Sequence, residues 1–117
     1  MPYMDIFVGP VLIADKDAYA AYARMMGELT LQAGALSVTA CWGSDCPDGM
    51  ANSFASAVKL QPGETIVTRF VRWTSKDMRD AAWAEMMKTR DMQSGSMPMP
   101  FDRTRVIFGG FEVLGEE

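Results

Sequence analysis

The sequence predicts an α+β fold in which a four-stranded antiparallel sheet carries two helices on one face. The first observation is a set of apolar or alternating runs that are typical of strands: Tyr3–Ile13, Ala35–Gly43, Thr65–Trp73 and Arg105–Leu114. The second is a pair of helical patterns, Lys16–Ala33 and Lys76–Thr89, each of which separates two of these strands. Because both helices share one face, the other face stays apolar and needs a cover.

The first strand begins almost at the N-terminus and alternates in polarity. We expect one face to carry Tyr3, Asp5, Phe7 and Gly9, and the other to carry Met4, Ile6 and Val8. Pro10 has no N–H group for a ladder hydrogen bond, so the strand should bend or reach a sheet edge there.

The first helix should begin after Asp15, a good N-cap residue, and end at Gly34, which tolerates a left-handed backbone. Its predicted buried stripe recurs at helical spacing: Tyr19, Tyr22, Met26, Leu29 and Ala33. The next strand alternates as well, with Leu36, Val38, Ala40 and Trp42 on one face.

The remaining elements are marked by turn residues, caps and glycines. Residues 45–49 predict a turn, and Ala57–Leu60 is one option for a short strand after it. Ser75 is the predicted N-cap of the second helix. Arg90–Thr104 is a predicted long loop in which Phe101 packs as an anchor. Gly109 and Gly110 predict a bulge or a group that approaches the last strand closely.

The composition indicates one domain that spans residues 1–117 and disfavours several classes of function. The net charge of −4 comes without a basic stripe, so nucleic acid is a poor partner. The longest apolar stretch, Ile6–Ala14, is too short for a membrane span, and no secretory signal is visible. Two cysteines do not form a disulfide framework, so we expect a cytoplasmic protein.

Three sets of segments carry a resemblance that covers nearly the whole chain. The first is Tyr3–Val11. The second comprises 34–36, Cys41, 47–49, 53–54 and 57–60. The third comprises 99–102, Arg105 and 107–113. Together, at matching spacing, they resemble the YbaA-like bacterial family of unknown function. The chain departs from that family's pattern at Ala40 and Ser44, where acidic residues are common.

The resemblance implies a ferredoxin-like βαββαβ subunit of the dimeric α+β barrel superfamily. In that superfamily two sheets pack through their helix-free faces, which implies a homodimer. The resemblance brings no established activity, because relatives include cofactor-independent monooxygenases, lactone isomerases, haem proteins and stress-responsive proteins. The haem branch needs an axial histidine, and this chain has no histidine.

Charged residues inside predicted strands are the candidate site. Asp5 and Glu112 lie on the first and last strands, which are neighbours in this topology, and Arg69 or Arg72 lies on the third. A close pair of carboxylates would supply a base or a proton donor, so Asp5 and Glu112 are the candidate catalytic residues. The competing interpretation, which we favour, is that each acid forms a structural ion pair with an arginine.

A ligand-binding site would also need side chains that line it. Candidate ligand-binding residues besides Arg69 and Arg72 are Cys41, Trp42 and Phe70. We expect no metal and no cofactor, because histidine is absent and the carboxylates that remain favour weakly held hard cations.

The sequence therefore predicts a homodimer that binds a small apolar or aromatic molecule. Two alternatives stay open: a cofactor-independent monooxygenase or isomerase that uses Asp5 or Glu112 as base, and a non-catalytic interaction or structural module with a closed core. The content of the cavity distinguishes them, since an enzyme needs polar lining, a binding protein apolar lining, and a module no cavity.

Overall fold

The structure is a computed structural model that describes residues 1–92 and 100–116. Within these residues the sheet has the order β2-β3-β1-β4, and every neighbouring pair is antiparallel. The strands are β1 (Tyr3–Leu12), β2 (Ser37–Trp42), β3 (Glu64–Trp73) and β4 (Ile107–Glu112). The α+β fold predicted from the sequence is confirmed.

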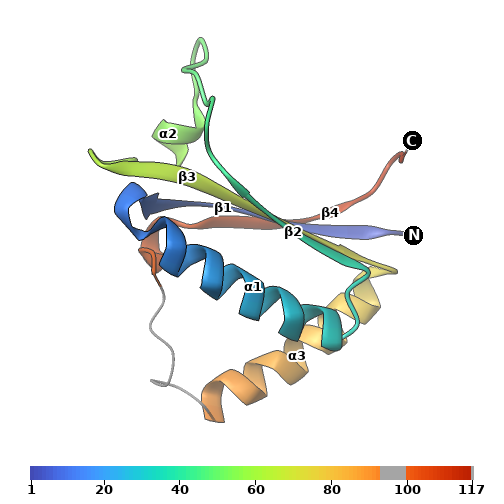
Figure 1. The fold of residues 1–117 in the computed structure, drawn as a ribbon. Coiled ribbons are helices and arrows are strands. Elements are labelled where there is room, and N and C mark those ends of the chain that lie inside the picture. The colour runs from blue at the N-terminus through green and yellow to red at the C-terminus, as the bar shows by residue number, and fades with distance from the viewer. Residues whose placement is uncertain (93–99, 117) are drawn as a thin grey trace.

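Two long helices cover one face of the sheet. They are α1 (Lys16–Gln32) and α3 (Lys76–Met92), and both lie on the same side in Figure 1. A third, short helix, α2 (Phe54–Ala57), lies on the opposite side. The 3₁₀ turns η1 (Ile13–Asp15) and η2 (Arg103–Arg105) lead into α1 and β4. We call the two sides of the sheet the helix face and the open face.

The register assigns each side chain to a face. Asp5 of β1 stands opposite Val71 of β3 and Gly110 of β4, so all three lie on the helix face. The alternation predicted for the first strand is confirmed, since Tyr3 and Asp5 are buried on this side. Pro10 pairs with β3 but lies beyond the last residue that β4 pairs, so it is at a local sheet edge as predicted.

The helix boundaries follow the predicted signals. Ser75 Oγ accepts a hydrogen bond from the N–H of Met78, and Gly34 has a φ of 121° after the end of α1. One member of the predicted stripe is wrong: Leu29 is 40% exposed, whereas Thr30, the next residue, is buried. Its hydroxyl donates to the carbonyl of Met26, so the buried polar group is satisfied inside the helix.

Between β2 and β3 the predicted short strand is wrong, because Ala57 ends α2. Ser53 and Ser56 form a reciprocal capping box that begins this helix. The helix and the residues after it pack on the open face, where Val58 joins Val8 and Ile66 in a buried cluster. Of the predicted loop Arg90–Thr104, residues 93–99 lie outside the described part, and α3 continues to Met92.

No helix in the described residues has the length and hydropathy that a membrane crossing requires. The two ends of the chain lie together, because the N–H of Val113 donates to the carbonyl of Pro2. On the open face Arg72 forms an ion pair with Glu116, which ties the C-terminal segment to β3.

Candidate functional site

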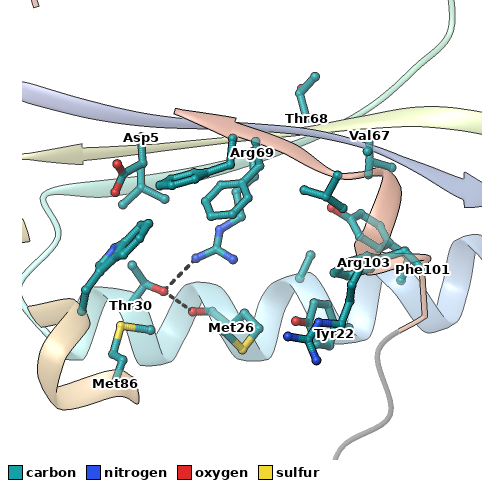
Figure 2. Close-up of a pocket in the computed structure, with 18 of the residues that line it drawn as sticks. Asp5, Tyr22, Met26, Thr30, Val67, Thr68, Arg69, Met86, Phe101 and Arg103 are labelled. Carbon is teal, nitrogen blue, oxygen red and sulfur yellow. Dashed lines mark hydrogen bonds between the residues drawn. The ribbon is translucent and has the colours of Figure 1, made fainter. Parts of the chain in front are cut away.

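A cavity of about 330 Å³ lies between the helix face of the sheet and the helices α1 and α3. The strands β1 and β3 line one side of the cavity, and the segment that holds Phe101 and Arg103 closes one end (Figure 2). Its aromatic lining residues are Phe7, Tyr19, Tyr22, Trp73, Trp83, Phe101 and Phe108. The cavity lies within one chain and on the helix side, so a ligand there needs no second sheet to enclose it.

Asp5 lies in this cavity wall and has no exposed surface. One carboxylate oxygen accepts a hydrogen bond from Trp73 Nε1 at 2.9 Å, and the other accepts one from Arg79 Nε at 3.0 Å. Burial works to lower the pKa of Arg79, but the charge and hydrogen bonds of Asp5 and Asp80 raise it overall. The arginine therefore stays charged and ties α3 to the centre of the sheet.

Glycine 110 explains how Arg79 reaches Asp5. A Cβ atom at this position would collide with the Tyr3 hydroxyl and with the Arg79 guanidinium. The guanidinium carbon lies 5.0 Å from the centre of the Tyr3 ring and 4.5 Å from that of Trp83, so two aromatic rings flank the charge. The close approach that the sequence predicts at this strand is thus confirmed.

Arg69 projects from β3 across the cavity to α1 (Figure 2). Its Nη2 donates to Thr30 Oγ1 at 3.0 Å, and Thr30 in turn donates to the carbonyl of Met26 at 2.6 Å. The guanidinium carbon also lies 5.2 Å from the centre of the Phe7 ring. These contacts place a positive charge beside apolar walls, with its position set from both the sheet and the helix.

Tyrosine 19 brings a hydroxyl to the same cavity. Burial raises the pKa of Tyr19 above its usual value, and the positive charge of Arg69 opposes that shift. The hydroxyl is therefore protonated at neutral pH and able to donate a hydrogen bond. The ring also packs edge-on against Phe101, with centroids 6.3 Å apart, so the predicted role of Phe101 as an anchor is confirmed.

A second ion pair fixes the closed end of the cavity. Arg105 donates two hydrogen bonds of 2.7 Å to Glu64 at the start of β3, and one of 2.9 Å to Asp102. This bidentate pair holds η2 against the sheet and places Arg103 beside the aromatic end of the cavity (Figure 2). The hydrogen bond from Arg105 also lowers the pKa of Glu64.

The structure separates the candidate residues named from the sequence. Asp5 and Arg69 line one cavity, whereas Glu112 is exposed on β4 opposite Tyr3. Arg72 lies on the open face and pairs with Glu116. The register puts Asp5, Glu112 and Arg69 on the helix face, but Glu112 lies outside the cavity that Asp5 and Arg69 line.

The three candidate wall residues lie outside this cavity. Cys41 and Phe70 belong to the open face, and the Cys41 side chain is exposed. Trp42 lies on the helix face at the edge strand, 6.2 Å from the Tyr19 ring, and with Cys41 it borders a separate groove beside α1.

Several residues of the cavity wall, and the arginine that pairs with Asp5 behind it, were missed from the sequence. Arg79, Trp83 and Met86 follow one another at helical spacing on α3, and that spacing is the signal that could have grouped them. Thr30 follows Met26 by four residues in the same way. Within the described residues no three histidine, cysteine, aspartate or glutamate side chains cluster in a way that could hold a metal ion.

A known family covers most of the chain. The family described as "Protein of unknown function (DUF1428)" matches residues 2–103. The protein named "Uncharacterized protein YbaA" from Escherichia coli strain K12 is 41% identical over 117 residues, which is 100% of both chains. The chain belongs to this family. The same protein name and identity recur in Shigella flexneri. The resemblance drawn from the sequence is confirmed.

Solved structures share the fold at low sequence identity. A dimeric ferredoxin-like protein from an uncultured marine organism has a TM-score of 0.59 at 13% identity and is covered over 100% of both chains. A Bacillus cereus protein provisionally described as an antibiotic biosynthesis monooxygenase has a TM-score of 0.53 at 12% identity, over 99% of this chain and 96% of that one. Rv0793 from Mycobacterium tuberculosis has a TM-score of 0.51 at 18% identity, and the match covers 99% of this chain and 98% of that one. These likenesses establish the ferredoxin-like fold.

Proposed function

We propose that the protein is a homodimer that binds a small apolar or aromatic molecule in the cavity between its sheet and the helices α1 and α3. The observation that carries the proposal is the cavity of about 330 Å³ with aromatic walls. Small-molecule sites span roughly 300–1,000 Å³ and have mostly apolar linings with a few polar groups.

Cavity filling tests the location of the site. Ala23 of α1 lines the cavity, whereas Ala21 on the same helix is exposed. We expect Ala23→Leu to fold and to lose most of the thermal stabilisation that a bound aromatic compound gives, because the added side chain occupies the cavity. Ala21→Leu is the matched control and should keep the wild-type response.

The ligand search is a thermal-shift screen against quinols, flavonoids and lactones. A ligand that binds only the folded state stabilises it by RT ln(1 + [L]/Kd), so the melting temperature rises with the logarithm of the ligand concentration once that concentration exceeds Kd. The proposal predicts at least one aromatic hit whose stabilisation is lost in Ala23→Leu. Hits that stabilise both variants equally would place the site elsewhere on the molecule.

We propose that the homodimer forms by contact between the open faces of two chains. Ile107 and Phe111 are 45% and 52% exposed on that face, and such a patch favours a partner surface. We expect Phe111→Glu to produce monomers in sedimentation velocity at micromolar concentration. Leu29→Glu, which changes a 40% exposed leucine of α1, should leave the mass unchanged. A wild-type monomer at that concentration would contradict the proposal.

A cofactor-independent monooxygenase or isomerase is the second candidate, and the observation that favours it is the Asp5 carboxylate in the cavity wall. Both oxygens of Asp5 already accept hydrogen bonds from Trp73 and Arg79, which favours the structural ion-pair interpretation. Oxygen uptake with a quinol that binds, followed by its loss in Asp5→Asn at unchanged binding, would support the enzyme instead.

A cytoplasmic location is part of the proposal. Cys41 and Cys46 are both free thiols, which suits a reducing compartment. Fractionation of cells that express a tagged chain tests the location, and recovery outside the cytoplasmic fraction would contradict it.

A further inference from the structure

We infer that Tyr19 is the polar anchor of the cavity, and that the bound molecule is a flat aromatic compound with a neutral carbonyl oxygen, which accepts a hydrogen bond from the Tyr19 hydroxyl. This inference rests on the proposed function, because it names the class of molecule that the same cavity takes. It follows from the burial of Tyr19, from the way in which its ring is held, and from the shape of the aromatic lining.

The first step is a buried hydroxyl that the protein itself leaves unpaired. Tyr19 is 8% exposed and lines the cavity. Among the described residues no group exchanges a hydrogen bond with its hydroxyl, and the effects on its pKa are burial and nearby charges alone. A buried polar group without a partner costs free energy, so most such groups in proteins are paired. A molecule in the cavity would supply the partner.

The second step is the rigid placement of the Tyr19 ring. Its centre lies 6.5 Å from that of Tyr22, 6.2 Å from that of Trp42 and 6.3 Å from that of Phe101. The side chain also packs with Val67 in a buried cluster. Because these neighbours leave the ring little freedom, the donor is in position before a ligand arrives, and binding costs less conformational entropy.

The third step is the side on which the hydroxyl lies. Among the charged or titratable groups, Arg69 has the largest effect on its pKa, followed by Tyr22. Both of these residues line the cavity, whereas Cys41, which borders the groove beside α1, has the smallest effect. Since an electrostatic effect falls with distance, the hydroxyl lies toward the cavity that Arg69 crosses (Figure 2).

The fourth step is the direction of the hydrogen bond and the charge of its acceptor. Burial raises the pKa of Tyr19, so the hydroxyl keeps its proton at neutral pH and is able to donate it. The positive charge of Arg69 opposes that shift, because it favours loss of the proton, and this makes the hydroxyl a better donor. A carbonyl oxygen accepts such a bond without a charge, whereas an ionised group would lose far more hydration free energy among aromatic walls.

The fifth step is shape. The rings of Phe7 and Phe108 lie 4.8 Å apart between centroids, and those of Trp83 and Phe108 also lie 4.8 Å apart. This continuous aromatic surface suits a flat molecule that stacks on it. A cavity of about 330 Å³ is at the small end of ligand sites, which favours one or two rings over a larger skeleton.

The experiment is calorimetric titration of the full chain with 2-acetylnaphthalene and with 2-isopropenylnaphthalene, in which a CH₂ group replaces the carbonyl oxygen. We expect Tyr19→Phe to bind the ketone roughly 5- to 50-fold more weakly than the wild type, as the loss of one hydrogen bond to a buried carbonyl would give. Its affinity for the hydrocarbon should equal or exceed that of the wild type. Tyr22→Phe is the matched control, because Tyr22 lines the same cavity but is only partly buried, and this variant should bind both compounds as the wild type does.

The melting temperature without ligand is the second measurement. Tyr19→Phe should melt at or above the Tm of the wild type, because the hydroxyl that it removes makes no hydrogen bond within the described part of the chain. A fall in Tm of more than about 4 °C would show that the hydroxyl has a structural partner in the protein, and would overturn the inference.

The outcomes separate the two levels of the proposal. Equal affinity of the wild type and Tyr19→Phe for the ketone overturns the role of Tyr19 and leaves the binding function standing. An equal loss for ketone and hydrocarbon does the same, because the ring and not the hydroxyl would then matter. A loss of ketone affinity in Tyr22→Phe as large as that in Tyr19→Phe contradicts the single anchor. Binding of neither compound by the wild type, or binding that survives Ala23→Leu, overturns both levels.

Discussion

Replacement of Asp5 by Asn isolates the charge of the buried ion pair while it preserves the shape of the side chain. Asp5 is wholly buried, and it accepts hydrogen bonds of 2.9 Å from Trp73 and 3.0 Å from Arg79. An asparagine keeps one acceptor oxygen for Trp73. It cannot balance the charge of Arg79, so an uncompensated cation is left in the protein.

The structure allows an estimate of the cost. The loss of one partner from a buried pair typically costs about 3–5 kcal/mol. The Arg79 side chain is 13% exposed and keeps a 2.8 Å contact with Asp80, so we expect the lower end of that range, about 3 kcal/mol. For a chain of this size that loss corresponds to a fall in Tm of about 12 °C.

Urea unfolding followed by circular dichroism measures the free energy of unfolding, and calorimetry measures Tm. Glu112→Gln is the control. Glu112 lies on the helix face like Asp5 but is exposed, so its variant should have the Tm of the wild type. The double variant Asp5→Asn, Arg79→Met should lose less stability than the sum of the single variants, since the unpaired charge is then gone. An Asp5→Asn variant that melts within about 3 °C of the wild type would refute the reasoning.

Two further predictions concern the elements around the cavity. Gly110→Ala should cost about 1–3 kcal/mol because its new Cβ meets the Tyr3 hydroxyl, whereas Gly115→Ala, with open space around it, should be neutral in the same melts. Hydrogen bonds from the Thr104 hydroxyl and from Arg105 hold the pKa of Asp102 at about 2, below its usual 3.8. The ionised Asp102 therefore stabilises the folded state above about pH 4, and this contribution to the free energy of unfolding is lost as the pH falls toward 2. Arg105→Gln should therefore lose less stability than the wild type on acidification from about pH 5 to 2, and parallel pH profiles would contradict this pairing.

The local residue pattern of the chain was enough to predict the four strands and the two long helices. The alternation of β1 has a period of two and needs no information from elsewhere, so Tyr3 and Asp5 were correctly predicted to share one face. Ser75 and Gly34 marked helix ends because capping is a property of a few adjacent residues. The short helix α2 was missed because four residues carry too little periodicity to distinguish a helix from a strand.

The candidate site depended on contacts between distant segments. Asp5 was recognised as a buried acid that needs a partner, but that partner, Arg79, lies 74 positions along the chain on a helix. No local pattern specifies which of the arginines meets it, since the choice depends on how α3 crosses the sheet and on the space left by Gly110. Arg69 and Arg72 are three residues apart on β3, so alternation puts them on opposite faces, but only the pairing of β3 with β1 shows that Arg69 is the one on the side of Asp5.

By itself, then, the sequence determined the order of the strands and the two long helices, the alternation within the strands, and the family, because each of these follows from short-range periodicity or from matching residues. Only the tertiary structure decided that the cavity lies on the helix side of one chain, lined by Asp5 and Arg69 but not by Glu112. A cavity is the volume that packed side chains fail to fill, and that volume depends on the separation of α1 and α3 from the sheet, which no single segment of sequence encodes.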